Sequence, residues 1–277
     1  MPSKRTKRRY DVSDDDIALS EKRMYGEKRP ETHAYVASGL GLTRVETAGG
    51  QIGRFSLVER CTARDVAGAD GEVAVATDES VLVSTDDGFA PTGFGPATAV
   101  GYDTDGLVAA GEGRVARYTD GDWTPLGEVA EVRAIDGGLL AAESGVYALP
   151  ALERLGLADV TDVADGYAAT ADGLYERTGE EWTELRSGSH RAVASDGQRA
   201  HAAGEDGLLE LVAGRWERCR LPVEERVVDV TYGDDTYAIT EAGTFLVDTE
   251  DAATADGQGG WRQRSLGVPE VVGVAVA

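Results

Sequence analysis

Several features that commonly point to a function are scarce or missing from this sequence of 277 residues. Only two cysteines occur, Cys61 and Cys219, and neither belongs to a CxxC pair, so we expect free thiols in a reducing compartment. No run of about 18 apolar residues could cross a membrane, and no apolar stretch follows the basic start to make a secretory signal. These absences favour a cytoplasmic protein that does not contact membranes.

Catalytic motifs are also missing. The sequence contains no Walker loop, no GxGxxG after a predicted strand, no GxSxG and no HExxH. Of its three histidines, His190 and His201 flank one predicted hairpin, but two imidazoles without a third placed ligand do not define a zinc site. We therefore predict no catalytic residue, no metal and no cofactor, and we regard a non-enzyme as the better hypothesis.

Lysine is confined to the beginning of the chain, and acidic residues dominate the rest. The formal net charge is −23, although residues 1–30 hold nine basic and six acidic side chains. Acidic residues occur in nearly every predicted turn, which is typical of proteins from haloarchaea. Molar salt in such a cytosol shortens the Debye length to about 3 Å and screens the repulsion among these charges. Halophilic adaptation explains this composition better than a dedicated basic partner.

The N-terminal residues 1–32 have no apolar periodicity, and we predict a basic, mixed-charge tail that is disordered. Its basic residues at positions 4–9 could contact nucleic acid electrostatically, but molar salt removes most of that attraction. Nucleic-acid binding is therefore not the favoured function. Whether residues 1–19 are a genuine part of the native protein stays open.

A repeated unit fills residues 33–277. Residues 160–185 show three short apolar or alternating runs separated by Asp-Gly pairs, followed by a fourth run that begins at Trp182. Asp-Gly between such runs is a strong hairpin signal, because the turn requires positive φ angles. The unit recurs at intervals of about 28–45 residues, which is typical of propeller blades with four strands.

The two ends of the repeat region decide the number of blades. Residues 34–58 contain three strands that lack an innermost one, whereas residues 271–277 form an innermost strand with nothing after it. Together they complete one blade and close the ring. The sequence thus predicts an all-β, seven-bladed β-propeller of four-stranded antiparallel blades, with the C-terminal strand paired to the N-terminal blade. A rival register, in which residues 22–26 supply that strand, is less favourable because the crowded axis requires small apolar residues.

The innermost strands hold the first set of candidate site residues. Asp65, Asp162 and Asp229 precede the central Val of their strands, where small apolar residues are expected. One alternative is structural: each carboxylate accepts hydrogen bonds from a neighbouring blade. The other is functional: the three line the channel and bind a cation, a sugar or another small ligand, with Arg64 and Arg133 as possible ion-pair partners.

The turns between the second and third strands hold a second set. Propeller topology places these turns on one face around the channel, where they form a rim of carboxylates. The rim candidates are Asp78, Glu112, Glu143, Asp172, Glu205 and Glu241. The turns on the opposite face are nearly as acidic, so a salt-adapted surface accounts for both. The tryptophans that begin the fourth strands are expected to pack between blades rather than to bind sugar.

The repeat YAATADGLYERTGEEW resembles regulator-type, YVTN- and WD40-like propeller repeats. From about Ser20 onward, the stretches SEKRMYGEKR, THAYVASGLGLTRV, GRFSLVERCTARDVA and VVGVAVA resemble a family of haloarchaeal β-propeller proteins. The resemblance covers about nine tenths of the chain and implies the fold and the source, but no activity.

Two functions remain open from the sequence. The first is a non-enzymatic scaffold in a halophilic cytosol that docks protein partners, and for it we expect a monomer. The alternative is a small-ligand, cation or sugar-binding propeller, possibly hydrolytic, that uses the channel mouth.

Overall fold

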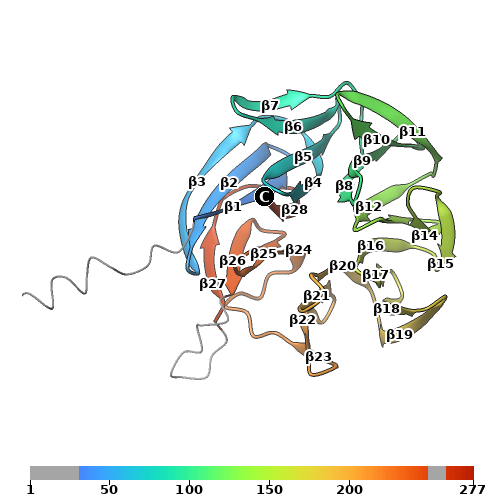
Figure 1. Cartoon of the computed structure of the whole chain (residues 1–277). Coiled ribbons are helices and arrows are strands. Elements are labelled where there is room, and N and C mark those ends of the chain that lie inside the picture. The colour runs from blue at the N-terminus through green and yellow to red at the C-terminus, as the bar shows by residue number, and fades with distance from the viewer. Residues whose placement is uncertain (1–30, 249–259) are drawn as a thin grey trace, which may run out of the picture. The chain divides into compact units, whose positions relative to one another are not determined.

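Seven four-stranded antiparallel sheets are arranged as the blades of a ring in the computed structural model, which describes residues 31–248 and 260–277 (Figure 1). The predicted seven-bladed propeller is therefore confirmed. The described residues contain 28 strands and no helix, and so no helix there is long and apolar enough to cross a membrane. Apart from Glu31 and Thr32, the predicted tail lies outside the described residues, and so does the rival strand at 22–26.

Each blade runs outward from the ring axis in chain order, except blade 1, which combines β28 with β1–β3. Blades 2 to 7 are β4–β7, β8–β11, β12–β15, β16–β19, β20–β23 and β24–β27. The innermost strands are β28 (Val271–Val276), β4 (Ala63–Ala69), β8 (Ala99–Asp103), β12 (Val132–Asp136), β16 (Val160–Ala164), β20 (His190–Ser195) and β24 (Val227–Tyr232). The second strands are β1 (Thr32–Ser38), β5 (Glu72–Thr77), β9 (Gly106–Gly111), β13 (Leu139–Ala142), β17 (Tyr167–Thr170), β21 (Ala200–Gly204) and β25 (Thr236–Thr240).

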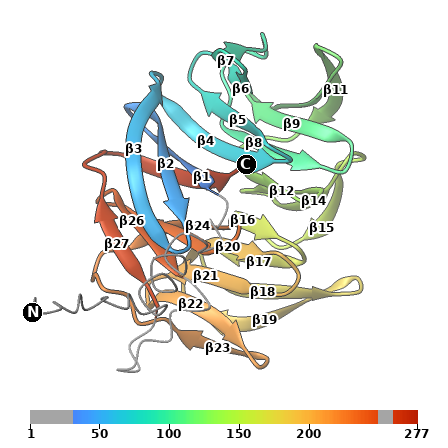
Figure 2. The same ribbon diagram turned by 60° about the vertical axis from the view of Figure 1, so that its left-hand side comes forward.

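The outer half of each blade is made in the same order. The third strands are β2 (Gly41–Ala48), β6 (Val81–Thr85), β10 (Arg114–Thr119), β14 (Gly145–Ala148), β18 (Gly173–Thr178), β22 (Gly207–Val212) and β26 (Thr244–Asp248). The outermost strands are β3 (Gln51–Glu59), β7 (Gly88–Pro91), β11 (Asp122–Glu128), β15 (Glu153–Gly156), β19 (Glu181–Ser187), β23 (Arg215–Arg218) and β27 (Arg262–Ser265). Figure 2 shows the same sheets from the side of blade 1.

Two kinds of turn connect the strands of a blade. Between β16 and β17, Asp165 and Gly166 both have positive φ angles, 39° and 84°, as the Asp-Gly signal predicts. The next Asp-Gly pair works differently. The hydroxyl of Thr170, at the end of β17, accepts hydrogen bonds from the backbone N–H groups of Asp172 and Gly173. Such Ser/Thr turns satisfy backbone donors where a buried strand ends.

The core lies between the blades, because both faces of each blade pack against a neighbour. Buried Val, Ala and Leu side chains form separate clusters at successive blade junctions. The inner strands approach closely: a Cβ atom on Gly101 of β8 would lie 2.0 Å from the carbonyl oxygen of Ile135 in β12. This contact explains why small residues are needed near the axis, since any side chain there would force the blades apart.

The tryptophans pack between blades, as the sequence predicts. The indole N–H of Trp182 donates to the carbonyl of Leu155 in the preceding blade, and that of Trp123 donates to Thr92. The ring of Trp216 meets Tyr167 of blade 5 edge-on, with ring centroids 5.7 Å apart. Large aromatic side chains thus fill the space that widens between blades away from the axis.

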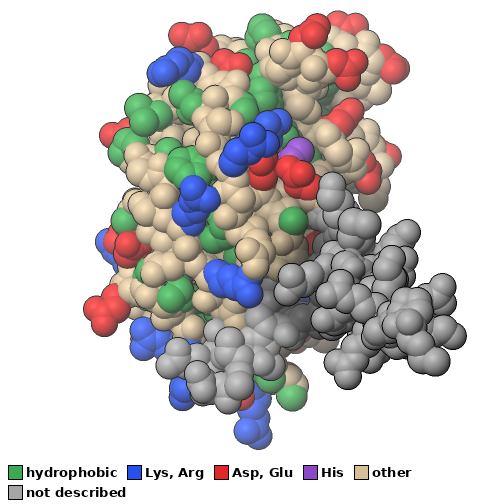
Figure 3. All heavy atoms as spheres, turned by 90° about the vertical axis from the view of Figure 1, so that its left-hand side faces the viewer, with side chains coloured by type: hydrophobic (Ala, Val, Ile, Leu, Met, Phe, Trp, Pro, Cys, Tyr) green, Lys and Arg blue, Asp and Glu red, His purple; other side chains and the backbone are tan. Residues whose placement is uncertain are grey.

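The two ends of the propeller close the ring in blade 1. β28 pairs antiparallel with β1, with Val36 opposite Val274, which confirms the predicted closure. Two arginines of β27 in blade 7 also contact blade 1: Arg262 donates to the Gly50 carbonyl and Arg264 to that of Ile52. Figure 3 shows this side of the molecule, over β3 and β27, where basic, acidic and apolar side chains are interspersed.

Candidate functional site

The three predicted inner-strand aspartates each join two blades. One oxygen of Asp162 accepts a hydrogen bond from the N–H of Val163, and the other accepts from Val193 of blade 6, both at 2.8 Å. Asp65 accepts from the next residue of its own strand and from Val100 of blade 3. This is the arrangement that the structural alternative described, and it places backbone donors on both oxygens of each carboxylate.

Asp229 repeats this arrangement at the ring closure. It accepts from Val230 of its own strand at 2.7 Å and from Val274 of β28 at 2.8 Å. The carboxylate therefore couples blade 7 to the C-terminal strand of blade 1. Hydrogen bonding at the axis and strand pairing farther out act together to hold the closing strand.

The aspartates share one cavity of about 300 Å³ around the axis, into which Asp136 of β12 also projects. The lining residues extend from the middle of the inner strands to the turns that lead into the second strands. The cavity thus lies toward the face opposite the predicted rim. Asp136 is exposed to this cavity, and the sequence analysis noted its turn but did not include it among the site residues.

Enclosure by the ring changes the protonation of these groups. Burial raises the pKa of Asp65 to about 7, against the hydrogen bonds from Val100 and Val66. Burial likewise raises the pKa of Asp229 to about 6, and it raises that of Asp162 well above its ordinary value, with the charge of Asp229 adding to the effect. The pKa of Asp136 rises to about 6 through burial and the nearby Asp165. Part of the cluster is therefore protonated near neutral pH.

The two predicted arginines do not join this cluster. Arg133 lies 3.7 Å from a carboxylate oxygen of Asp159, in the loop before β16, and donates to the carbonyl of Val160. Arg64 is exposed, and among residues 31–248 and 260–277 no ion pair or hydrogen bond links it to any of the three aspartates. Alternation along a strand explains this, because neighbouring residues point to opposite sides.

The rim candidates lie where the topology predicts. All six are exposed in the turns between second and third strands: Asp78, Glu112, Glu143, Asp172, Glu205 and Glu241. Backbone hydrogen bonds place these turns beside the loops that enter the innermost strands, as from Asp78 to Thr62 and from Glu205 to Ser189. One face of the propeller therefore carries both kinds of loop, and we call it the rim face.

Two of the rim residues adjoin a pocket between blades 6 and 7. This blade 6–7 pocket has a volume of about 700 Å³ and includes Glu205. Its outer wall is the loop from β23 to β24, in which Arg226 forms an ion pair with Glu241 at 3.2 Å. The pocket is lined by Glu205, Gly207, Leu208, Arg218, Cys219, Arg220, Leu221, Val223, Glu224, Glu225 and Arg226. It combines apolar side chains with three exposed or partly paired arginines on an otherwise acidic protein.

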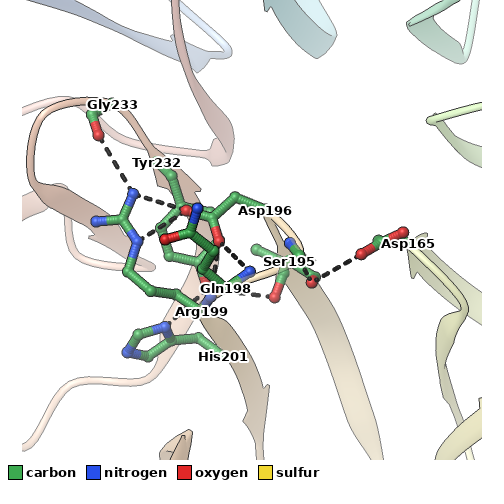
Figure 4. Close-up of polar contacts among 10 residues, drawn as sticks. Asp165, Ser195, Asp196, Gln198, Arg199, His201, Tyr232 and Gly233 are labelled. Atoms are coloured by element: carbon green, nitrogen blue, oxygen red, sulfur yellow. Dashed lines mark hydrogen bonds and ion pairs between the residues drawn. The ribbon is translucent and has the colours of Figure 1, made fainter.

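A polar network on the opposite face was not predicted from the sequence. Figure 4 shows Arg199 reaching from the turn after β20 to Asp196 and to the carbonyl of Gly233 in blade 7. The guanidinium also stacks on the ring of Tyr232, 4.6 Å from its centroid. Burial would raise the pKa of Asp196, but hydrogen bonds from residues 198 and 199 and the Arg199 charge lower it overall. The network therefore ties blade 6 to blade 7.

Tyr232 extends this network to His201, which the sequence analysis did not place in a site. The Tyr232 hydroxyl lies 2.8 Å from Nδ1 of His201 and donates to the carbonyl of Ala194. Burial lowers the pKa of His201 to about 4, so its imidazole is neutral at ordinary pH. Cys61 and Cys219 are both free thiols, as expected.

One group of side chains in the described ranges has the composition and spacing of metal ligands. A ring nitrogen of His201, a carboxylate oxygen of Glu210 and the Sγ atom of Cys219 lie within 4.8 Å of one another. The predicted approach of His190 to His201 is not part of this group, because His190 bonds to the carbonyl of Gly188. The sequence offered no signal for the triad, since its members are not in a motif.

Comparison with known proteins supports the fold. The structure of the computationally designed protein Ika8 matches with a TM-score of 0.54 and 14% identity over 89% of this chain and 91% of that chain. The WD40 β-propeller domain of Doa1 matches with a TM-score of 0.53 and 18% identity over 74% and 83%. The structure of YCF48 bound to D1 peptide matches with 0.53 and 13% over 75% and 82%. At these identities the likeness concerns the fold alone.

No curated protein sequence matches this chain. A family model does match, over residues 18–277, and it is described as HVO_0234-like, beta propeller. This name implies a haloarchaeal origin, and the matched range agrees with the resemblance that starts near Ser20. Since the model covers nearly the whole chain, the protein belongs to the HVO_0234-like family of β-propellers.

Proposed function

We propose that this protein is a non-enzymatic interaction scaffold of a halophilic cytosol, and that it binds a protein partner on its rim face. One observation carries the proposal: the polar groups of the channel serve to hold the blades together. Both oxygens of Asp65, Asp162 and Asp229 accept backbone hydrogen bonds across blade junctions. The place where an enzyme of this fold would keep reactive groups is thus occupied by structural ones.

The blade 6–7 pocket is the part of the rim face that fits a partner best. Leu221 and Val223 offer apolar surface, and the exposed Arg218 and Arg220 can form paired hydrogen bonds to carboxylates. Hydrogen bonds at contact distance persist in molar salt, which removes only longer-range attraction. The pocket therefore fits an extended segment of a partner that combines apolar and acidic residues.

The structural relatives are consistent with this use. A WD40 domain and a propeller with a bound peptide are among the proteins that share the fold. Because fold alone does not specify function, the likeness adds to the pocket argument and does not replace it. The small-ligand alternative would need inner-strand carboxylates that are not committed to backbone donors, and the observed hydrogen bonds favour their structural role.

The test is affinity capture of the tagged full chain from its host, in molar potassium chloride, read by mass spectrometry. We expect a stoichiometric partner with the wild type and with Gln198→Ala, an exposed change on the opposite face. We expect at least tenfold less of that partner with the double variant Arg218→Glu/Arg220→Glu. The absence of any stoichiometric partner, or equal recovery with the double variant, would contradict the proposal.

A further inference from the structure

The group formed by His201, Glu210 and Cys219 has a specific structural origin in blade 6. His201 of β21 and Glu210 of β22 are direct cross-strand partners, so their side chains lie on the same face of the sheet. Glu210 is opposite Glu217 of β23, and Cys219 follows two residues later, on the same face again. The three side chains therefore meet because of strand register, and they face blade 7.

The surroundings of the triad orient its histidine. The Tyr232 hydroxyl has one proton, which it donates to the carbonyl of Ala194, so it accepts a hydrogen bond from Nδ1–H of His201. This leaves the lone pair on Nε2 for another partner. A histidine ligand in a metal site commonly donates its second ring N–H in this way, which fixes the tautomer and the direction of the ring.

The triad is also accessible and has a suitable charge. Cys219 is half-buried and lines the blade 6–7 pocket, through which an ion can enter. A neutral imidazole, a carboxylate and a thiolate together carry two negative charges, which a divalent cation neutralises in this enclosed position. Nitrogen, oxygen and sulfur donors in one site are typical of zinc.

We propose that His201, Glu210 and Cys219 bind a zinc ion between blades 6 and 7, with water from the adjoining pocket as the fourth ligand. Ligand atoms around tetrahedral zinc lie about 3.3–3.8 Å apart, so side-chain rotation must bring these atoms together by up to about 1 Å. Binding fastens the end of the fourth strand of blade 6 to its second and third strands. The proposal does not depend on the scaffold function.

Cobalt(II) is the most selective probe, because only a thiolate ligand produces an intense cobalt–sulfur charge-transfer band in the near ultraviolet. The full-length protein is stripped with a chelator, desalted and titrated with cobalt and then zinc in molar potassium chloride. We expect one cobalt per chain with that band, and we expect zinc to abolish it by displacement. Weak binding to surface carboxylates produces no such band, so its absence would overturn the proposal.

The variants separate this site from the rest of the chain. Cys219→Ser should abolish the band, and His201→Gln should weaken zinc binding at least 100-fold, whereas Cys61→Ser, which alters the other thiol, should change neither. Tyr232→Phe should weaken binding by about 10–100-fold through the orientation of His201. Circular dichroism verifies that each variant is folded. A band that persists in Cys219→Ser or disappears in Cys61→Ser would contradict the assignment.

Should Cys219→Ser not fold, zinc-dependent stability provides a second measurement. Zinc binds the folded state, so it should raise the thermal unfolding midpoint of the wild type and of Cys61→Ser, in proportion to the logarithm of its concentration. The midpoint of His201→Gln should not respond. A response of the same size in His201→Gln would show that zinc acts elsewhere and would overturn the proposal.

Discussion

At the scale of single residues, the inner-strand aspartates replace what an apolar residue at the axis cannot provide. Two backbone N–H groups, one in each of two blades, point toward the same place near the axis. The carboxylate of Asp162 accepts both, from Val163 and Val193. Thr161 next to it adds a hydrogen bond to the carbonyl of His190, also in blade 6. The junction between blades 5 and 6 is therefore specified by polar contacts as well as by packing.

Replacement of Asp162 by alanine should be costly, because two enclosed N–H groups then lose their acceptor. We expect the free energy of unfolding to fall by about 1–3 kcal/mol. Asp172→Ala, an exposed change in the same blade, should stay within about 0.5 kcal/mol of the wild type. Denaturant unfolding in molar salt measures both. Equal effects of the two substitutions would show that the interblade hydrogen bonds contribute little.

The raised pKa of Asp65, about 7, predicts how stability depends on pH. A carboxyl whose pKa is higher in the folded than in the unfolded state adds stability that is complete below the unfolded pKa. That stability is lost as pH rises through the folded pKa. Asp65 should therefore make the wild type less stable at pH 8 than at pH 6. His201, with a lowered pKa of about 4, acts in the opposite sense as pH falls below about 6.5.

Comparison with Asp65→Asn separates the two effects, since the variant keeps His201 but has no carboxyl at this position. Between pH 6 and 8 we expect the unfolding free energy of the wild type to decline more steeply than that of Asp65→Asn. Molar potassium chloride keeps the exposed carboxylates screened during the measurement. Parallel curves for the two proteins would contradict the role of Asp65.

At the scale of strands, β28 is the element on which ring closure depends. It pairs with β1, packs its Val274 into the core of blade 1, and donates the N–H of Val274 to Asp229. Without it, β1 would present an unpaired edge, which is prone to association with other chains. The closing strand therefore has a larger effect than its six residues suggest.

Truncation after Glu270 removes this strand. We expect the truncated protein to lose its cooperative thermal transition and to aggregate. Removal of Ala277 alone, which is exposed and follows the strand, should leave both properties unchanged. Circular dichroism and size-exclusion chromatography distinguish the two proteins. A monomeric, cooperatively folded product from the longer truncation would show that the ring does not need β28.

At the scale of the whole molecule, charge sets the conditions in which the fold is stable. The net charge of −23 favours expansion of the chain through self-repulsion, and salt removes that repulsion over distances beyond the Debye length. The rim carboxylates are exposed and close to the backbone of the blade turns, so they contribute to this repulsion without compensating contacts, except for the ion pair of Glu241.

Stability should therefore increase with potassium chloride from about 0.1 M to above 1 M. A variant in which all six rim carboxylates are changed to amides should show a smaller increase, because fewer charges need screening. The changes are Asp78→Asn, Glu112→Gln, Glu143→Gln, Asp172→Asn, Glu205→Gln and Glu241→Gln. Thermal unfolding at a series of salt concentrations measures the effect. Identical salt dependence in the variant would place the repulsion elsewhere on the surface.

The sequence by itself determined the number of blades, their boundaries and the way the ring closes. These features depend on local signals: Asp-Gly turns, alternation of apolar residues, and an unpaired strand pattern at each end of the repeat region. The turn at Asp165-Gly166 and the pairing of residues 271–276 with β1 are such cases. Since side chains in a strand alternate with period two, the buried face of each strand followed as well.

Only the tertiary structure decided which residues meet across blade junctions. The second oxygen of Asp65 binds Val100, 35 residues away, and Arg133 pairs with Asp159 instead of an inner-strand aspartate. The meeting of His201 with Cys219, next to Tyr232 of another blade, also has no sequence motif. Such contacts depend on the angle and spacing between neighbouring blades. Those quantities result from packing along both faces of every sheet and cannot be obtained from the period of a single strand.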